Sequence, residues 1–110
     1  MTISHCVASG NAYGLDAQVL GLATGTTAKI NVDSCQVANN SADGIVIGGF
    51  NDIGALPLIL VSNSTVVDNG GIGLHGGVGP SSVLMGSLGN NMVYGNAGGD
   101  VVSDAVLDPN

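Results

Sequence analysis

Eight aspartates, two histidines and two cysteines are the side chains of this 110-residue chain best suited to acid–base, nucleophilic or metal chemistry. Asp43 and Asp68 are the candidates for a carboxylate pair, because both border the same predicted turn. Glycoside hydrolysis needs two carboxyl groups held at a defined separation. Aspartate also caps local backbone in turns, and we favour that structural role for both residues. We therefore expect no catalytic residue, with Asp43 and Asp68 kept as the candidates if the protein is an enzyme.

Four further residues are candidates for binding a ligand. His75 follows a predicted strand and begins the loop sequence Gly-Gly-Val-Gly-Pro. Phe50 lies among polar neighbours, where an exposed aromatic ring can stack on a sugar. The candidate ligand-binding residues are Phe50, Asn51, Asp52 and His75. A solvated histidine and a phenylalanine that covers the loops are the alternative interpretations.

Four copies of one six-residue pattern position these side chains. The copies begin at Cys6, Cys35, Ser64 and Asn91, and each ends with an asparagine, at Asn11, Asn40, Asn69 and Asn96. Their starts lie 29, 29 and 27 residues apart. A fixed period of this size indicates a solenoid in which each repeat is one coil. The predicted coils of this single domain cover about residues 1–28, 29–57, 58–84 and 85–110.

Apolar and polar residues alternate over three short stretches of each coil, as the second coil illustrates. Ile30 and Val32 face inward in the first stretch, Val37 in the second, and Ile45 and Ile47 in the third. The inward positions slip by one residue between the first two stretches, which indicates a bend. We expect each strand to pair in parallel with its counterpart in the next coil. The sequence thus predicts an all-β fold, a parallel β-helix of about four coils with three short strands per coil. Longer connections are predicted over residues 18–28, 48–57 and 75–84.

The recurring Ile-x-x-Ser/Asn-x-Val-x-x-Asn, followed by Gly-Ile, resembles the repeat of right-handed parallel β-helix proteins of the pectin-lyase-like superfamily. The resemblance covers nearly the whole chain and implies a right-handed, bacterial-type β-helix. It also implies that Asn11, Asn40, Asn69 and Asn96 stack as an inward ladder. Asparagine tolerates a left-handed turn, and its amide can satisfy backbone groups that a bend leaves unpaired. The superfamily's lyases use an arginine or lysine base and calcium, whereas this chain has no arginine and the single lysine Lys29.

Cys6 and Cys35 occupy the same position in adjacent coils. Stacked Cα atoms would lie roughly 5 Å apart, within the range for a disulfide. We favour two thiols packed in a core column, because parallel in-register neighbours rarely offer the required torsion. The absence of Cys-x-x-Cys spacing argues against a zinc site. We expect neither a metal nor a cofactor.

Charge and hydropathy restrict the partners. The net charge is −7, and one lysine cannot form the basic cluster that nucleic acid requires. The same charge disfavours an anionic membrane surface, and no apolar run approaches the roughly 18 residues of a membrane span. Met1 precedes a repeat directly, with no signal peptide. We expect a secreted or cell-surface location for a longer parent protein in which Met1 is not the natural start.

The two ends of the predicted stack differ. Ile3, Cys6 and Ala8 would lie bare at the first coil, whereas the acidic tail from Asp100 to Pro109 is expected to stop further strand pairing. We therefore expect a non-catalytic structural or interaction module. Its first coil would be covered by a second copy in a homo-oligomer, or by upstream coils of a longer chain. The alternative is a carbohydrate-binding or hydrolase-like fragment that holds a polysaccharide along the flank of long loops.

Overall fold

Three parallel β-sheets make up the fold of the computed structural model, which describes residues 1–20, 29–50, 58–78, 84–87, 89–102 and 105–107. These residues contain no helix. Sheet A has the order β1 (Thr2–Ser4), β4 (Lys29–Asp33), β7 (Leu58–Ser62), β10 (Leu84–Ser87) and β13 (Ala105–Leu107). Sheet B contains β2 (Val7–Ser9), β5 (Gln36–Ala38), β8 (Thr65–Val67) and β11 (Met92–Tyr94). Sheet C contains β3 (Leu15–Leu20), β6 (Ile45–Phe50), β9 (Ile72–Val78) and β12 (Gly99–Val102).

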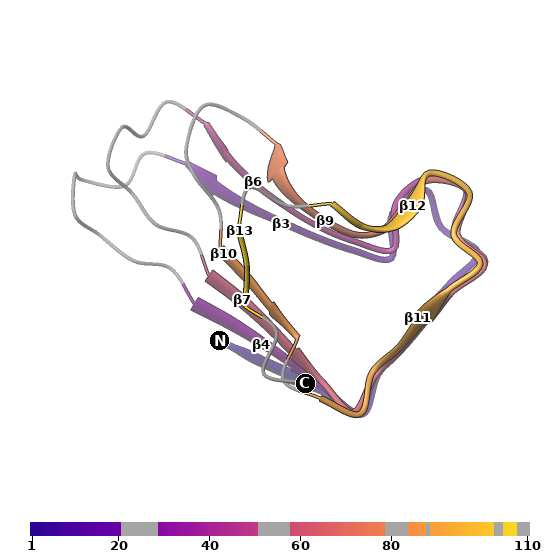
Figure 1. The fold of residues 1–110 in the computed structure, drawn as a ribbon, viewed down its shortest axis with the longest axis horizontal. Coiled ribbons are helices and arrows are strands. Elements are labelled where there is room, and N and C mark those ends of the chain that lie inside the picture. Colours follow the sequence, from indigo (N-terminus) through magenta and orange to yellow (C-terminus); the bar gives the residue numbers. More distant parts are fainter. Residues whose placement is uncertain (21–28, 51–57, 79–83, 88, 103–104, 108–110) are drawn as a thin grey trace.

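The three sheets stand as three walls around a common interior (Figure 1). Consecutive strands along the chain belong to different sheets, and each strand pairs in parallel with the strand three places later. We call each set of three a layer: the first layer is β1–β3, the second β4–β6, the third β7–β9 and the fourth β10–β12. This all-β, parallel arrangement confirms the predicted class and is consistent with a β-helix.

The core is formed by the inward side chains of the middle layers. Val32 and Val61 come from sheet A, Val37 and Val66 from sheet B, and Ile45 from sheet C, and each is at most 1% exposed. Each such side chain contributes about 1.5–3 kcal/mol by leaving water. The inward columns predicted from the sequence are thus confirmed in the middle layers.

Two corners turn the chain through left-handed residues. Between sheets A and B, the residues His5, Ser34, Asn63 and Asn90 have φ between 49° and 56°, which confirms the bend predicted there. Between sheets B and C, the left-handed residues are Gly10, Asn39, Asp68 and Gly95. The expectation that the following asparagines take this conformation is wrong. The residue before each asparagine turns the chain, so the asparagine remains free to point its amide inward.

The strands of sheet C are longer than predicted. β3 extends to Leu20, β6 to Phe50 and β9 to Val78, so Phe50 and His75 belong to strands, and their predicted loop positions are wrong. Gln18 to Leu20 pair with Gly48 to Phe50. Strand pairing uses backbone groups, and a neighbouring strand satisfies them even where glycines offer no side chain.

The C-terminal segment also departs from the prediction. β13 pairs in parallel with β10, through Leu84 with Ala105 and Gly86 with Leu107. Strand pairing therefore continues into the acidic tail, where it was expected to stop. The reason is a short apolar segment, Ala105–Leu107, that can extend sheet A between the aspartates.

Candidate functional site

The four asparagines at the second corner form a hydrogen-bonded ladder. Asn40 Oδ1 accepts a bond of 3.0 Å from the backbone N–H of Asn11. Asn69 Oδ1 accepts two bonds from Asn40, one from its backbone N–H at 3.1 Å and one from its side-chain amide at 2.9 Å. Asn96 Oδ1 likewise accepts two bonds from Asn69, from the backbone N–H at 3.1 Å and from the side-chain amide at 2.8 Å. The side-chain amides of Asn40, Asn69 and Asn96 also donate to backbone carbonyls of sheet B. We call these four residues the asparagine ladder; its contacts bind the layers to one another.

The asparagine ladder has a direction, and its two ends differ. The bonds between asparagines all run the same way, from an N–H or amide in one layer to the Oδ1 of the asparagine in the next. At the C-terminal end, Asp100 Oδ1 takes the place of a further asparagine and accepts from the N–H and amide of Asn96, at 3.4 and 3.1 Å. At the N-terminal end, the Asn11 amide donates to Ser9 O in its own layer. Asn11 Oδ1 accepts no hydrogen bond from the part of the chain that the structure describes.

Three edge strands lie together at that N-terminal end. β1, β2 and β3 are each the outermost strand of their sheet. Met1 and Val7 are 74% and 72% exposed there. Ala8 is only half-buried, whereas Val37, its neighbour in register, is fully buried. Each inward column therefore ends unfinished at the first layer.

A cavity of about 280 Å³ lies between sheets A and C at the same end. Its apolar lining comes mainly from the first two layers, namely Met1, Ile3, Leu15, Ala17, Ile30 and Val32. The N-terminal end thus combines the outermost strands of three sheets with an apolar hollow. Such a surface is typical of contacts with another protein chain.

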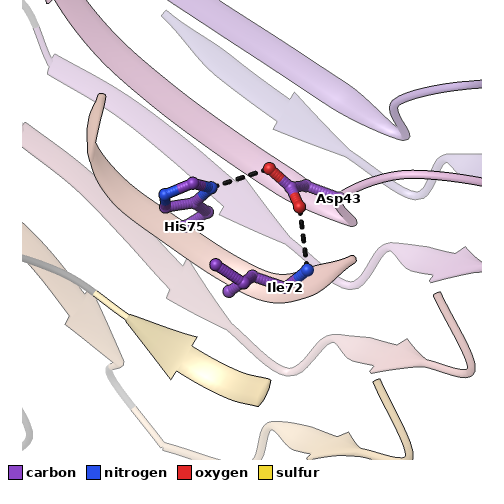
Figure 2. A network of polar contacts seen from close by, with 3 residues as sticks. All are labelled: Asp43, Ile72 and His75. Atoms are coloured by element: carbon purple, nitrogen blue, oxygen red, sulfur yellow. Dashed lines mark hydrogen bonds and ion pairs between the residues drawn. The ribbon is translucent and has the colours of Figure 1, made fainter. Parts of the chain in front are cut away.

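Asp43 and His75 form the one ion pair among the described residues (Figure 2). Asp43 precedes β6 and His75 lies on β9. Asp43 Oδ2 lies 2.7 Å from His75 Nδ1, and Asp43 Oδ1 accepts a bond of 2.8 Å from the N–H of Ile72. The pair therefore ties the turn before β6 to the third layer.

The pair also orients the His75 ring. A carboxylate only accepts hydrogen bonds, so Nδ1 carries a hydrogen and Nε2 is an acceptor when the ring is neutral. The same arrangement positions a histidine for acid–base chemistry where a nucleophile or substrate reaches Nε2. No serine, threonine or cysteine of the described segments bonds to the ring. The geometry supports a brace between layers, and ligand binding by His75 stays a prediction.

The two candidate carboxylates have separate surroundings. Asp68 is an exposed, left-handed residue at the second corner, next to Gly95 in register. No hydrogen bond joins it to Asp43 within the described residues. Asp43 accepts a hydrogen bond from the backbone N–H of Ile72, the first residue of β9. This bond to nearby backbone is of the kind expected for the turn role favoured for Asp43.

Asp33 accepts three side-chain hydrogen bonds, and sequence reasoning did not single it out. It accepts from Ser34 Oγ at 2.9 Å, Ser62 Oγ at 2.8 Å and Asn63 Nδ2 at 2.8 Å. The bonds from Asn63, Ser62 and Ser34, in that order, lower the pKa of Asp33 below its ordinary value of 3.8, with a smaller contribution from the charge of His5. Asp33 therefore braces the first corner on the outside of the stack.

Asp100 is the second structural residue that sequence reasoning missed. It follows the last asparagine of the ladder by four residues, and its role depends on a turn that the repeat pattern does not contain. The two cysteines are free thiols, as expected. Asn51 and Asp52 lie outside the described residues, and of Phe50 the structure describes only the backbone. Their ligand-binding role stays a prediction.

The comparisons with known proteins identify no relative: no family model matches the chain, and no curated protein or solved structure is similar enough to count as a match. Within the described segments, no three His, Cys, Asp or Glu side chains lie close enough together to hold a metal ion. The same segments contain no helix that is long and apolar enough to cross a membrane.

Proposed function

We propose that this chain is a right-handed parallel β-helix of about four coils, of the pectin-lyase-like type, that serves as a non-catalytic structural and interaction module. Its interaction surface is the N-terminal end, and its partner is a second copy of the same chain. The observation that carries the proposal is that three edge strands, β1, β2 and β3, lie at one end of the molecule, with an apolar hollow between the sheets that contain β1 and β3.

A second copy fits this end because a strand edge is complementary to itself. Each edge presents alternating N–H and C=O groups, and an antiparallel copy supplies the opposite group at each position. A two-fold axis across the end would place the same surface on both copies. The half-buried side chains of the first layer, with Ile3 and Ala8 among them, would then complete their inward columns.

The chemistry of the two ends favours contact between two N-terminal ends. At the C-terminal end the ladder donors of Asn96 already bond to Asp100, and β13 covers β10. Three aspartates, Asp100, Asp104 and Asp108, also belong to that part of the sequence. Joining the N-terminal ends keeps the Asp100 carboxylates of the two copies apart in a protein whose net charge is −7.

Two matched lysine substitutions test which end is used. Ala8 and Val93 stand in the same inward column of sheet B, at its N-terminal and C-terminal edges. An inward lysine at an edge strand opposes pairing with another chain, because its ammonium must stay in water. We expect Ala8→Lys to give a monomer and Val93→Lys to keep the dimer, as measured by light scattering after size exclusion.

Far-UV circular dichroism would establish that both variants keep their β-structure. Loss of the dimer in Val93→Lys with retention in Ala8→Lys would place the contact at the opposite end and contradict the proposal. A folded Ala8→Lys protein that remains dimeric would contradict it as well.

A further inference from the structure

Cys6 and Cys35 face each other across the first two layers. The register pairs on either side of them, Ser4 with Asp33 and Val7 with Gln36, place the cysteines opposite one another. Their Sγ atoms lie 2.7 Å apart, and the N–H of Gln36 donates to Cys6 O at 2.8 Å. Cys35 is 3% exposed, whereas Cys6 is half-buried.

We propose that this thiol pair is a modification site, at which a small-molecule disulfide of the glutathione type converts the two thiols into an intrachain disulfide between the first and second layers. The bond would tie the edge layer of the protein to its core. It lies within one copy of the chain, and the exchange takes place on the monomer, in which no second copy covers Cys6.

The distances leave little to rearrange, and closing the bond requires mainly a rotation of the two side chains. A disulfide requires an S–S distance of about 2.05 Å and Cα atoms about 4.4–6.8 Å apart. Paired strands provide a separation of roughly 5 Å, and the two sulfur atoms are already in contact. The next positions of the same column are Ser64 and Asn91, which offer no competing thiol.

The reaction is an ordinary pair of thiol–disulfide exchanges. The thiolate of Cys6, the accessible partner, attacks one sulfur of the oxidant, and the other half of the oxidant leaves as a thiol. Cys35, as its thiolate, then attacks the Cys6 sulfur of the mixed disulfide and releases the second half. Two protein S–H bonds and one S–S bond of the oxidant are replaced by one protein S–S bond and two small thiols, which take up the two protons.

Exchange should be slow at neutral pH and accelerate steeply in base. Burial, followed by the hydrogen bond and the charge of Cys35, raises the pKa of Cys6 to about 11. Only the thiolate attacks, so its population limits the rate. With that pKa, the first-step rate should rise roughly hundredfold between pH 8 and pH 10, against roughly fourfold for an ordinary exposed thiol.

The test is to incubate the folded protein with oxidised glutathione at pH 8 and at pH 10, and to follow the intact mass and the thiols that remain after unfolding. We expect a single chain with no covalent bond to a second copy. Its mass should be about 2 Da lower than that of the reduced protein, and both thiols should be lost. Serine occupies this column at Ser64, so Cys35→Ser and Cys6→Ser are matched controls. Cys35→Ser should stop at a glutathione adduct on Cys6, and folded Cys6→Ser should not react.

Three results would overturn the proposal. The first is a wild-type protein that stays reduced at pH 10. The second is a stable adduct on Cys6 with Cys35 still free. The third is a covalent dimer in place of the internal bond.

Discussion

Asn69 illustrates how single side chains hold this molecule together. It is 2% exposed, its Oδ1 accepts two bonds from Asn40, and its amide donates to Val37 O at 3.3 Å and to Asn96. A buried polar group that loses its partner costs about 1–3 kcal/mol. We expect Asn69→Ala to lower the free energy of unfolding by about 3–5 kcal/mol, as measured by urea denaturation, because several groups lose their partners together.

Asn11→Ala is the matched control for that substitution. Asn11 stands in the same column but is exposed, and its amide bonds only within its own layer. Its replacement should cost less than about 1 kcal/mol. Equal losses in the two variants would show that the asparagine ladder does not stabilise the fold in the way its geometry indicates.

Asp33 allows a residue-level test by pH titration. The largest cause of its lowered pKa is the bond from Asn63, which is left-handed, so Asn63→Gly removes the donor without straining the backbone. We expect NMR titration to find the pKa of Asp33 below 3.8 in the wild type and higher in Asn63→Gly. Because folding lowers this pKa, the stabilisation is present above the ordinary value and is lost as the pH falls through the folded value.

Asn90→Gly serves as the control for this experiment. Asn90 is also left-handed, and its amide bonds to Asn63 Oδ1 and not to Asp33. The Asn90→Gly substitution should change the pKa of Asp33 less than the Asn63→Gly substitution does. The interpretation of the corner would be wrong if Asn63→Gly left that pKa unchanged.

At the residue scale, side chains that recur were predictable and those that occur once were not. The inward asparagines follow from the repeat, because each copy repeats the same contact. Asp100 and Asp33 act through partners in other layers, and nothing in their immediate sequence marks those partners. His75 was predicted only as a ligand-binding residue, and its partner Asp43 became clear only once the layers were in register.

The packing of elements depends on glycines that leave room for the ladder. A Cβ atom added at Gly44 would lie 2.7 Å from both Gly73 O and Val66 Cγ1, and 2.9 Å from Asn69 Nδ2. Close approach of sheets B and C at this corner therefore requires glycine. We expect Gly44→Ala to lower the free energy of unfolding by about 1–3 kcal/mol, measured by urea denaturation.

The matched control at this scale is Gly10→Asn. Gly10 has φ +73° with open space around it, and Asn39 occupies the same corner position in the next layer. Asparagine accepts this conformation, so the variant should stay within about 0.5 kcal/mol of the wild type. If Gly44→Ala were equally well tolerated, the close approach of the sheets would not be what constrains this position.

At the element scale, strand identity was predictable and strand length was not. The period-two pattern of Ile45-Val-Ile47 predicts a strand, but Gly48 and Gly49 resemble a loop when only the local sequence is considered. Pairing with β9 extends β6 to Gly48, and pairing with β3 extends it to Phe50. Length is thus set by pairing partners that are distant in the sequence.

For the whole molecule, the direction of the ladder explains why its two ends differ. One end directs donors outward and satisfies them with Asp100, whereas the other presents the acceptor Asn11 Oδ1 together with three strand edges. The column of inward asparagines was predictable, because the residue recurs in every coil. The donors satisfied by Asp100 were not, because they depend on a turn outside the repeat.

Sedimentation equilibrium of the wild-type protein over a range of concentrations tests the central claim, association through the N-terminal end, most directly. The chain has a mass of 10.7 kDa. We predict a concentration-dependent approach to about twice that mass, a closed dimer that grows no further because a two-fold contact uses each N-terminal end once. A single species at 10.7 kDa across the whole range, or open-ended growth beyond the dimer, would contradict the account.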